Sequence, residues 1–189
     1  MNKLNLFFIL AVILCITAGC EKDNQNGGSL KIEAKVINGN DYNDLVDEVR
    51  VVTTHIIFEV PLTEVVTCNY KNGGFALTLP KKIVESAYSF TVNGQTSMTT
   101  SIYANFYAYK NNERVGEFVY CSVDSEHIVR FYYACESGEA SVNMSMYDVT
   151  VMFKFKKGWN TVYFSKWYSG YDKSLTKPNA ELNWYFIPN

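Results

Sequence analysis

Residues 102–121 read IYANFYAYKNNERVGEFVYC and indicate the fold class more clearly than any other stretch of the chain. In the first half, small or apolar residues alternate with tyrosine and asparagine, which is the period of a strand with one buried face. The polar residues 110–113 then turn the chain, and residues 114–121 continue as a second strand. We therefore predict a β-hairpin with one buried face. Its outward side chains include Tyr103, Tyr107 and Tyr109.

The same alternation recurs along most of the chain, and hardly any stretch has the period of a helix. Pro61 cannot donate to a strand ladder and is predicted to end a strand whose buried face carries Val52 and Thr54. The glycine turn at residues 71–74 predicts a hairpin between the strands that flank it. A change of phase predicts a bulge or a break near Tyr147. The predicted strands are 30–36, 52–60, 63–70, 75–79, 102–109, 114–121, 129–135, 141–155, 159–167 and 182–186.

Short strands, tight turns and only four prolines favour an all-β chain. The predicted architecture is an antiparallel β-sandwich that forms a single domain over residues 30–189. A lipocalin-like β-barrel is the alternative. Residues 80–88 fit either a short helix or a crossing at the sheet edge.

The first 20 residues have the pattern of an export signal. Lys3 gives a positive start, residues 6–16 are apolar throughout, and the short residues TAG precede Cys20. The apolar run is shorter than the roughly 20 residues that cross a bilayer, so cleavage is favoured over a permanent span. The ending resembles the lipobox of bacterial lipoproteins, which implies a signal peptide at residues 1–19 and lipidation of Cys20. An ordinary secretory signal is the alternative.

Residues 20–29 are polar and contain glycines, which is typical of a flexible tether. Glu21 and Asp23 make the start of this tether acidic. This arrangement resembles the surface-export pattern of Bacteroidota lipoproteins. The resemblance implies an outer-membrane protein anchored by its N-terminal lipid and exposed at the cell surface, with a periplasmic orientation as the alternative.

Two short phrases resemble sequences of known protein families. The phrase NGGFALTLP at residues 72–80 is similar to the glycine-phenylalanine strand of transthyretin-like sandwich modules. The phrase FKKGWNTVY at residues 155–163 is similar to a strand-turn-strand phrase of Bacteroidota lipoproteins. Together they imply a transthyretin- or immunoglobulin-like sandwich in a lipoprotein of the cell envelope. They imply little about activity, because most of these families have none assigned.

The charge and the cysteines limit the partners that we expect. The formal net charge is −2 and the basic residues are scattered, so we expect no nucleic acid partner. Export permits a disulfide. Cys68, Cys121 and Cys135 allow at most one pair, and their burial as free thiols is the alternative.

We expect neither catalysis nor a bound metal or cofactor. The sequence holds two histidines, His55 and His127. Ser125, His127 and Asp124 are too close in sequence to form a catalytic relay, because adjacent strand residues point to opposite faces. The acidic residues 41–48 lack the spacing of a calcium-binding loop. No pair of carboxylates stands out for glycoside hydrolysis.

The candidate binding surface is aromatic, because aromatic rings stack on sugars and anchor protein partners. It comprises Tyr103, Tyr107, Tyr109, Trp159, Trp167, Tyr168 and Tyr171. Burial of these rings beneath a second sheet or a loop is the alternative. The leading hypothesis is a lipid-anchored cell-envelope binding protein, without catalysis, that recognises a glycan or a partner protein. The alternatives are a structural subunit of a surface assembly that works by strand addition, as in pili, and a lipocalin-like carrier of a small apolar ligand.

Overall fold

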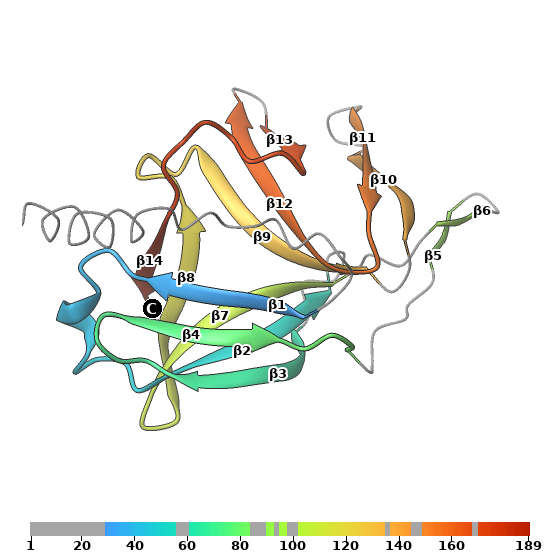
Figure 1. Cartoon of the computed structure of the whole chain (residues 1–189). Coiled ribbons are helices and arrows are strands. Elements are labelled where there is room, and N and C mark those ends of the chain that lie inside the picture. Colours follow the sequence, from blue (N-terminus) through green and yellow to red (C-terminus); the bar gives the residue numbers. More distant parts are fainter. Residues whose placement is uncertain are drawn as a thin grey trace, which may run out of the picture.

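The protein is described by a computed structural model that covers residues 29–55, 61–83, 90–92, 95–97, 102–134, 137–144, 149–167 and 170–189 (Figure 1). Several predictions fall outside these residues. They concern the signal peptide, Cys20, most of the tether, residues 56–60 and 84–88, Cys135 and Tyr168. Among the residues covered, no helix is long and apolar enough to cross a membrane.

The described chain is almost entirely β-structure, and its strand ladders are antiparallel. A large eight-stranded sheet has the order β13-β12-β9-β8-β7-β2-β3, with β14 also paired to β8. Its strands are β2 (Glu48–His55), β3 (Pro61–Asn69), β7 (Ile102–Lys110), β8 (Glu113–Cys121), β9 (His127–Ala134), β12 (Gly158–Trp167), β13 (Gly170–Ser174) and β14 (Asn183–Pro188). Three two-stranded sheets pair β1 (Leu30–Lys35) with β4 (Gly74–Leu79), β5 (Phe90–Val92) with β6 (Gln95–Ser97), and β10 (Gly138–Met144) with β11 (Val149–Phe155). A short 3-10 helix, η2 (Gly39–Tyr42), follows β1.

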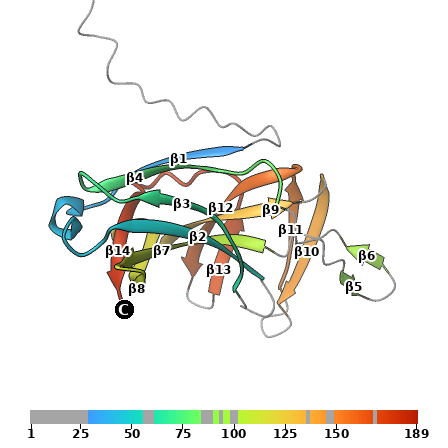
Figure 2. The ribbon, with the colours of Figure 1, turned by 90° about the horizontal axis from the view of Figure 1, so that it is seen from below.

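The sheet of β1 and β4 forms a second layer over β3, β2 and β7 of the large sheet (Figure 2). The large sheet is open, because its terminal strands β13 and β3 are not paired to each other in the described part of the chain. The predicted all-β antiparallel sandwich is therefore confirmed, and the barrel alternative is not. We call the side of the large sheet toward β1 and β4 the core face, and the opposite side the outer face.

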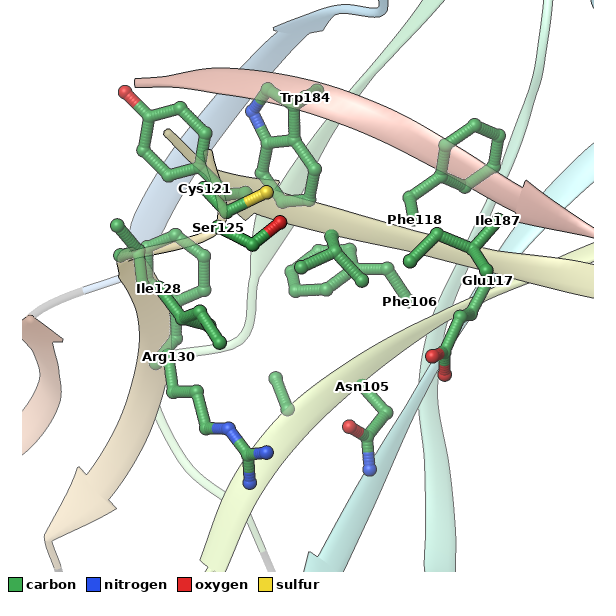
Figure 3. A pocket seen from close by; sticks show the side chains of 15 residues that line it. Asn105, Phe106, Glu117, Phe118, Cys121, Ser125, Ile128, Arg130, Trp184 and Ile187 are labelled. Atoms are coloured by element: carbon green, nitrogen blue, oxygen red, sulfur yellow. The ribbon is translucent and has the colours of Figure 1, made fainter. Parts of the chain in front are cut away.

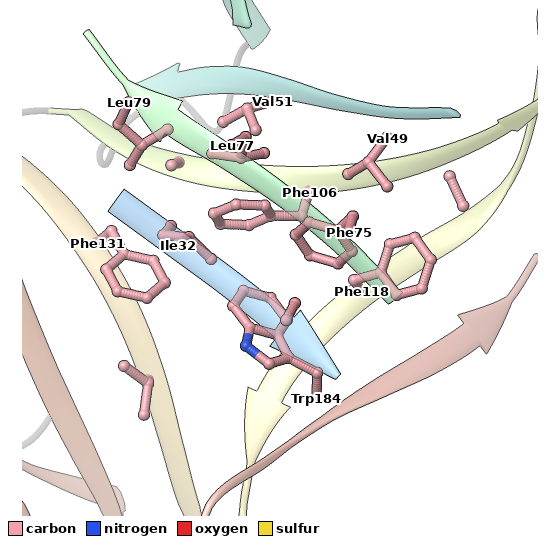
Figure 4. Packing of buried hydrophobic residues seen from close by; sticks show 14 of the residues in the cluster. Ile32, Val49, Val51, Phe75, Leu77, Leu79, Phe106, Phe118, Phe131 and Trp184 are labelled. Carbon is pink, nitrogen blue, oxygen red and sulfur yellow. The ribbon is translucent and has the colours of Figure 1, made fainter. Parts of the chain in front are cut away.

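The core lies between these two layers (Figure 4). Alternate residues of β1 and β4 supply one side of it, as the period of two predicted. Rings from both layers meet in the middle: Phe75 of β4 lies 5.2 Å from Trp184 of β14 and 6.1 Å from Phe106 of β7, measured between ring centres. Aromatic contacts of this kind add to the free energy gained from burial of apolar surface.

The hairpin predicted at residues 102–121 forms as β7 and β8. Asn111 and Asn112 make its turn, both with positive φ, a conformation that asparagine tolerates better than most residues. Ala104, Phe106 and Ala108 are buried on the core face. The alternation in the sequence therefore predicted both this hairpin and its buried face.

The prediction of a hairpin around residues 71–74 was only partly right. The turn exists, with Asn72 and Gly73 at positive φ, but β4 leaves β3 after the turn and pairs with β1. The residues that follow β1 bind the backbone of this turn: Val36 N–H donates to the Gly73 oxygen at 3.0 Å. Because β4 lies over the core face instead of extending the large sheet, its apolar side chains pack into the core from the second layer.

The predicted phase of β2 was wrong. The side of β2 that faces the core carries Val49, Val51 and Thr53, whereas Val52 faces the opposite side. Thr54, predicted on the same face as Val52, is nevertheless buried. Pro61 is the first residue of β3, a position that a proline can take, and the predicted strand end before it lies outside the described residues. The predicted break near residue 147 agrees with the division of residues 141–155 between β10 and β11.

Candidate functional site

The most distinctive feature of the large sheet is a triangular gap where β7, β8 and β9 meet in pairs. The strands pair at its corners as Phe106↔Phe118, Ala104↔Phe131 and Tyr120↔Val129. Along β7, the partner changes from β8 to β9 between Phe106 and Ala104. One residue of each strand lies between two corners and borders the gap: Asn105, Val119 and Arg130. The chain therefore leaves an opening inside a sheet that is otherwise continuous.

A pocket of about 310 Å³ occupies this gap (Figure 3). Phe106, Phe118 and Phe131 line it with Trp184, which closes the gap from the core face. The Trp184 ring stacks on Tyr120 at 5.1 Å between centres and meets Phe106 edge-on at 5.0 Å. These contacts hold a largely aromatic floor in place.

Polar groups from three strands surround the mouth of the pocket on the outer face. In Figure 3 the polar ends of Asn105, Glu117 and Arg130 point the same way, away from Trp184. The Asn105 Nδ2 donates to Thr54 Oγ1 at 2.7 Å, which fixes the amide. Glu117 lies 3.6 Å from the Arg114 guanidinium. An apolar floor with a few placed polar groups is typical of a site for a small ligand.

The three predicted tyrosines of β7 form a row on the outer face, and the guanidinium group of an arginine lies over each ring. Arg130 lies 4.8 Å from the Tyr103 ring centre, Arg114 lies 3.8 Å from that of Tyr107, and Arg50 lies 4.0 Å from that of Tyr109. Cation–π contacts of this kind cover ring surface that an aromatic platform would need. The row therefore positions three cations rather than three free rings.

Tyr103 also belongs to a second apolar cluster on the outer face. Its buried members are Tyr103, Tyr132, Ala134, Phe155 and Val162. Phe155 comes from β11, so this hairpin covers part of the outer face. Burial raises the pKa of Tyr132 to about 12 and also raises that of Tyr107. Both hydroxyls therefore stay protonated near neutral pH.

Among the aromatic residues predicted near turns, Trp159 does not line this pocket. Trp159 is 6% exposed and lies in the main core, where its Nε1–H donates to the Pro80 oxygen at 2.9 Å. Its ring also packs against Tyr133 at 5.3 Å between centres, and because the side chain is buried it offers no exposed face to a ligand. The backbone pairs Trp167↔Gly170 and Lys166↔Tyr171 place Trp167 and Tyr171 at the turn of the β12–β13 hairpin. Tyr168 lies outside the described residues.

Sequence reasoning did not find the residues that do form the pocket. Asn105, Glu117 and Arg130 come from the consecutive strands β7, β8 and β9, and Trp184 comes from the distant β14. Alternation indicated an outward side chain at Asn105 and an inward one at Trp184. It gave no sign that three strands would separate beside them, because the gap depends on the registers of three strand pairs.

The two described cysteines are free thiols. Cys121 lines one end of the pocket, and burial raises its pKa. Burial raises the pKa of Cys68 to about 11. Because the thiolate is the reactive form, neither cysteine is activated as a nucleophile.

The polar groups at the β8–β9 turn hold the turn together. Ser122 Oγ donates to Asp124, and His127 N–H donates to Ser122 Oγ at 3.0 Å. The His127 ring bonds across the sheet to Ser165 Oγ, with Nδ1 at 2.9 Å. The His127 ring therefore bonds to Ser165, and Asp124 accepts from Ser122, so these contacts do not link Ser125, His127 and Asp124 in a relay. In the part of the chain that the structure describes, no three acidic, histidine or cysteine side chains are grouped to hold a metal ion.

Comparisons with protein-family models, with curated proteins and with solved structures found no match for this chain. The function is therefore inferred from the residues of the pocket and from the N-terminal sequence.

Proposed function

We propose that this chain is a lipid-anchored protein of the outer membrane that binds a glycan, without catalysis, in the gap between β7, β8 and β9. The proposed location rests on the resemblance of residues 1–20 to a lipoprotein signal ending at Cys20. The proposed activity rests on the pocket. A terminal sugar is favoured over a partner protein because the pocket is small and concave, whereas a stable protein interface buries roughly 1,200 Å² or more.

The observation that carries the proposal is an aromatic floor beneath a polar mouth. A sugar ring has an apolar face that packs on aromatic side chains and hydroxyl groups that need hydrogen-bond partners. Trp184, Phe106 and Phe118 supply the floor, while Asn105 and Glu117 offer an amide and a carboxylate at the mouth. The volume of about 310 Å³ lies at the lower end of the range for ligand pockets, roughly 300–1,000 Å³, which suits one terminal sugar.

The chemistry of the pocket favours binding over hydrolysis. Most glycosidases place two carboxylates on opposite sides of the bond that they cleave. Among the described residues that line this pocket, Glu117 supplies the one carboxylate, and Arg114 lies beside it. One carboxylate cannot supply both the acid and the nucleophile or base that this hydrolysis needs.

The test is a binding screen with a variant that fills the pocket. The soluble protein from Ser29 onward is titrated with a panel of neutral and acidic oligosaccharides, beside Val119→Phe. Val119 borders the gap, so the larger ring should occupy the pocket and weaken binding by about tenfold or more. Thr78→Phe is the matched control, because Thr78 is exposed on β4 in the other layer of the sandwich.

Three results would decide the proposal. Binding that Val119→Phe weakens and Thr78→Phe leaves unchanged supports it, provided that both variants keep the circular dichroism spectrum of the parent. Binding that both variants keep would overturn the assignment of the pocket. No binding to any oligosaccharide of the panel would overturn the glycan function.

A structural role in a surface assembly is the second candidate. The observation that favours it is the open large sheet, whose terminal strands in the described chain are β3 and β13. An open edge presents backbone groups to an incoming strand. Light scattering of the mature protein distinguishes the two roles: growth into linear polymers favours assembly, and a monomer that binds sugar favours the pocket.

A further inference from the structure

We propose that the ligand of the gap pocket is acidic and that Arg130, with Lys173 nearby, binds its carboxylate or sulfate group. This inference rests on the proposed function of the pocket as a glycan site and narrows the class of glycan. It comes from a difference among the three arginines of the outer face.

Two of these arginines have carboxylate partners. Arg50 pairs with Glu48 and lies 3.9 Å from Glu64, and Arg114 lies 3.6 Å from Glu117. Arg130, by contrast, forms no ion pair with any carboxylate in the ranges that the structure describes. It is exposed and lines the pocket. Its charge is therefore available to a ligand.

Aromatic rings hold the Arg130 guanidinium at the pocket. The guanidinium carbon lies 4.8 Å from the centre of Tyr103 and 5.8 Å from that of Phe164. Such contacts restrict a long side chain without neutralising it. A positioned guanidinium can bind a carboxylate or a sulfate through two parallel hydrogen bonds, which an ammonium group cannot do.

A second cation, Lys173, also lies near the Phe164 ring. Lys173 of β13 is the cross-strand neighbour of Phe164, and its Nζ lies 5.5 Å from the ring centre. Lys173 is half-buried, and burial together with the charge of Arg130 lowers its pKa. No carboxylate of the described residues forms an ion pair with it. Two neighbouring cations repel each other, and an anion bound between or beside them would relieve this repulsion.

The two sides of the pocket mouth therefore differ in charge. On the β8 side, Glu117 is balanced by Arg114. On the β9 side, Arg130 is unbalanced, and Lys173 adds to its field. An acidic sugar would bind with its charged group toward β9, its apolar face on the aromatic floor and its hydroxyls near Asn105 and Glu117.

The experiment compares ligands that differ in one group. Methyl glucuronide, glucose 6-sulfate, methyl glucoside and inorganic sulfate are titrated into the isotope-labelled protein from Ser29 onward, and affinities are taken from NMR shifts. We expect the acidic sugars to bind about tenfold or more tightly than methyl glucoside. The stronger of the two acidic sugars identifies the group as a carboxylate or a sulfate.

Three variants locate the charge. Arg130→Gln should remove the preference for acidic sugars, Arg130→Lys should keep part of it, and Lys173→Gln should reduce it. Arg50→Gln is the matched control, because Arg50 also lies over a β7 tyrosine but already has carboxylate partners. Arg130→Lys keeps the charge, so it still tests the site if Arg130→Gln fails to fold.

The outcomes separate this inference from the proposed function. Equal affinity for methyl glucoside and methyl glucuronide, with both lost in Val119→Phe, would overturn the acidic ligand and keep the glycan pocket. Sulfate binding that Arg130→Gln abolishes, without binding of any sugar, would keep the anion site and overturn the glycan function. An equal loss in Arg50→Gln and Arg130→Gln would overturn the assignment to Arg130.

Discussion

Tyr70 reaches across the core to Gly39: its hydroxyl donates a hydrogen bond of 2.8 Å to the Gly39 oxygen, and the bond is buried. Tyr70 follows β3 in the large sheet, and Gly39 begins the 3-10 helix after β1. The bond therefore joins the two layers of the sandwich at one end. Burial also raises the pKa of Tyr70 to about 12, so the hydroxyl remains a donor at neutral pH.

Tyr70→Phe should lower the free energy of unfolding by about 1–3 kcal/mol, because it leaves the buried Gly39 oxygen without its donor. The measurement is urea denaturation followed by tryptophan fluorescence. Tyr185→Phe, on the half-buried Tyr185 of β14, is the control and should change little. Equal losses of unfolding free energy in both variants would show that the Tyr70–Gly39 hydrogen bond does not account for the loss.

The turn beside Tyr70 depends on glycine. A Cβ atom at Gly39 would approach the Gly73 backbone more closely than real Cβ atoms do, and Gly73 itself has a φ of +75°. Gly39→Ala should therefore force the β1–η2 connection away from the Lys71–Gly74 turn and cost about 2 kcal/mol or more in unfolding free energy. Asn38→Gly is the control.

Asn38 already has a positive φ of 53°, a conformation that glycine adopts freely. Its replacement by glycine should change the unfolding free energy by less than about 1 kcal/mol. A loss as large in Asn38→Gly as in Gly39→Ala would mean that the turn is sensitive to any change, and not to the added Cβ. Both variants are measured by thermal unfolding in the same buffer.

The sequence was sufficient to predict most of the strands and several of their faces, but not the short strands β5, β6 and β13. Alternation correctly identified the buried sides of β1, β7 and β14, and glycine or asparagine marked the turns at Gly73 and Asn111. These properties depend on local conformation and on the contrast between apolar and polar neighbours. They are therefore present in a single stretch of chain.

The sequence was not sufficient to predict partners between distant strands. The pairing of β4 with β1, and not with β3, depends on contacts between residues some 40 positions apart, such as Lys35↔Gly74. The gap depends on three registers at once, and the stacking of arginines on the β7 tyrosines depends on which strands lie beside β7. The phase of β2 was misjudged because residues 52–60 also alternate, while Val49 and Val51 carry the buried face.

The stability of the fold should depend on pH through Asp47. Its carboxylate accepts hydrogen bonds from Lys110 Nζ at 2.7 Å and from Asn111 N–H at 3.0 Å, and these contacts lower its pKa below the ordinary value of 3.8. A lowered pKa stabilises the fold above the unfolded pKa, and this contribution is lost as the pH falls through the folded pKa. Unfolding in urea should therefore become easier between about pH 5 and about pH 2, and Asp47→Asn should flatten this dependence.

Asp172→Asn is the control for this pH dependence, because it removes an exposed carboxylate of β13 away from the β7–β8 turn. The urea midpoint of each variant is measured in steps across the acidic range. Asp124 and Glu33 also have lowered pKa values, so part of the dependence should remain in Asp47→Asn. An unchanged slope in Asp47→Asn would contradict the role given to the Lys110 contact.

Trp184 should support both the fold and the pocket, whereas Trp159 should support the fold alone. Both side chains are 6% exposed, so each substitution by alanine should cost about 3–5 kcal/mol in unfolding free energy. Trp184 closes the floor of the gap, so Trp184→Ala should also weaken ligand binding in the fraction that stays folded. Trp159→Ala is the matched control, because Trp159 bonds to Pro80 away from the pocket and should leave the affinity unchanged. Trp184→Phe, which keeps a ring, should give an intermediate affinity in the NMR titration. Equal affinity in Trp184→Ala and Trp159→Ala would show that the floor of the pocket does not contact the ligand.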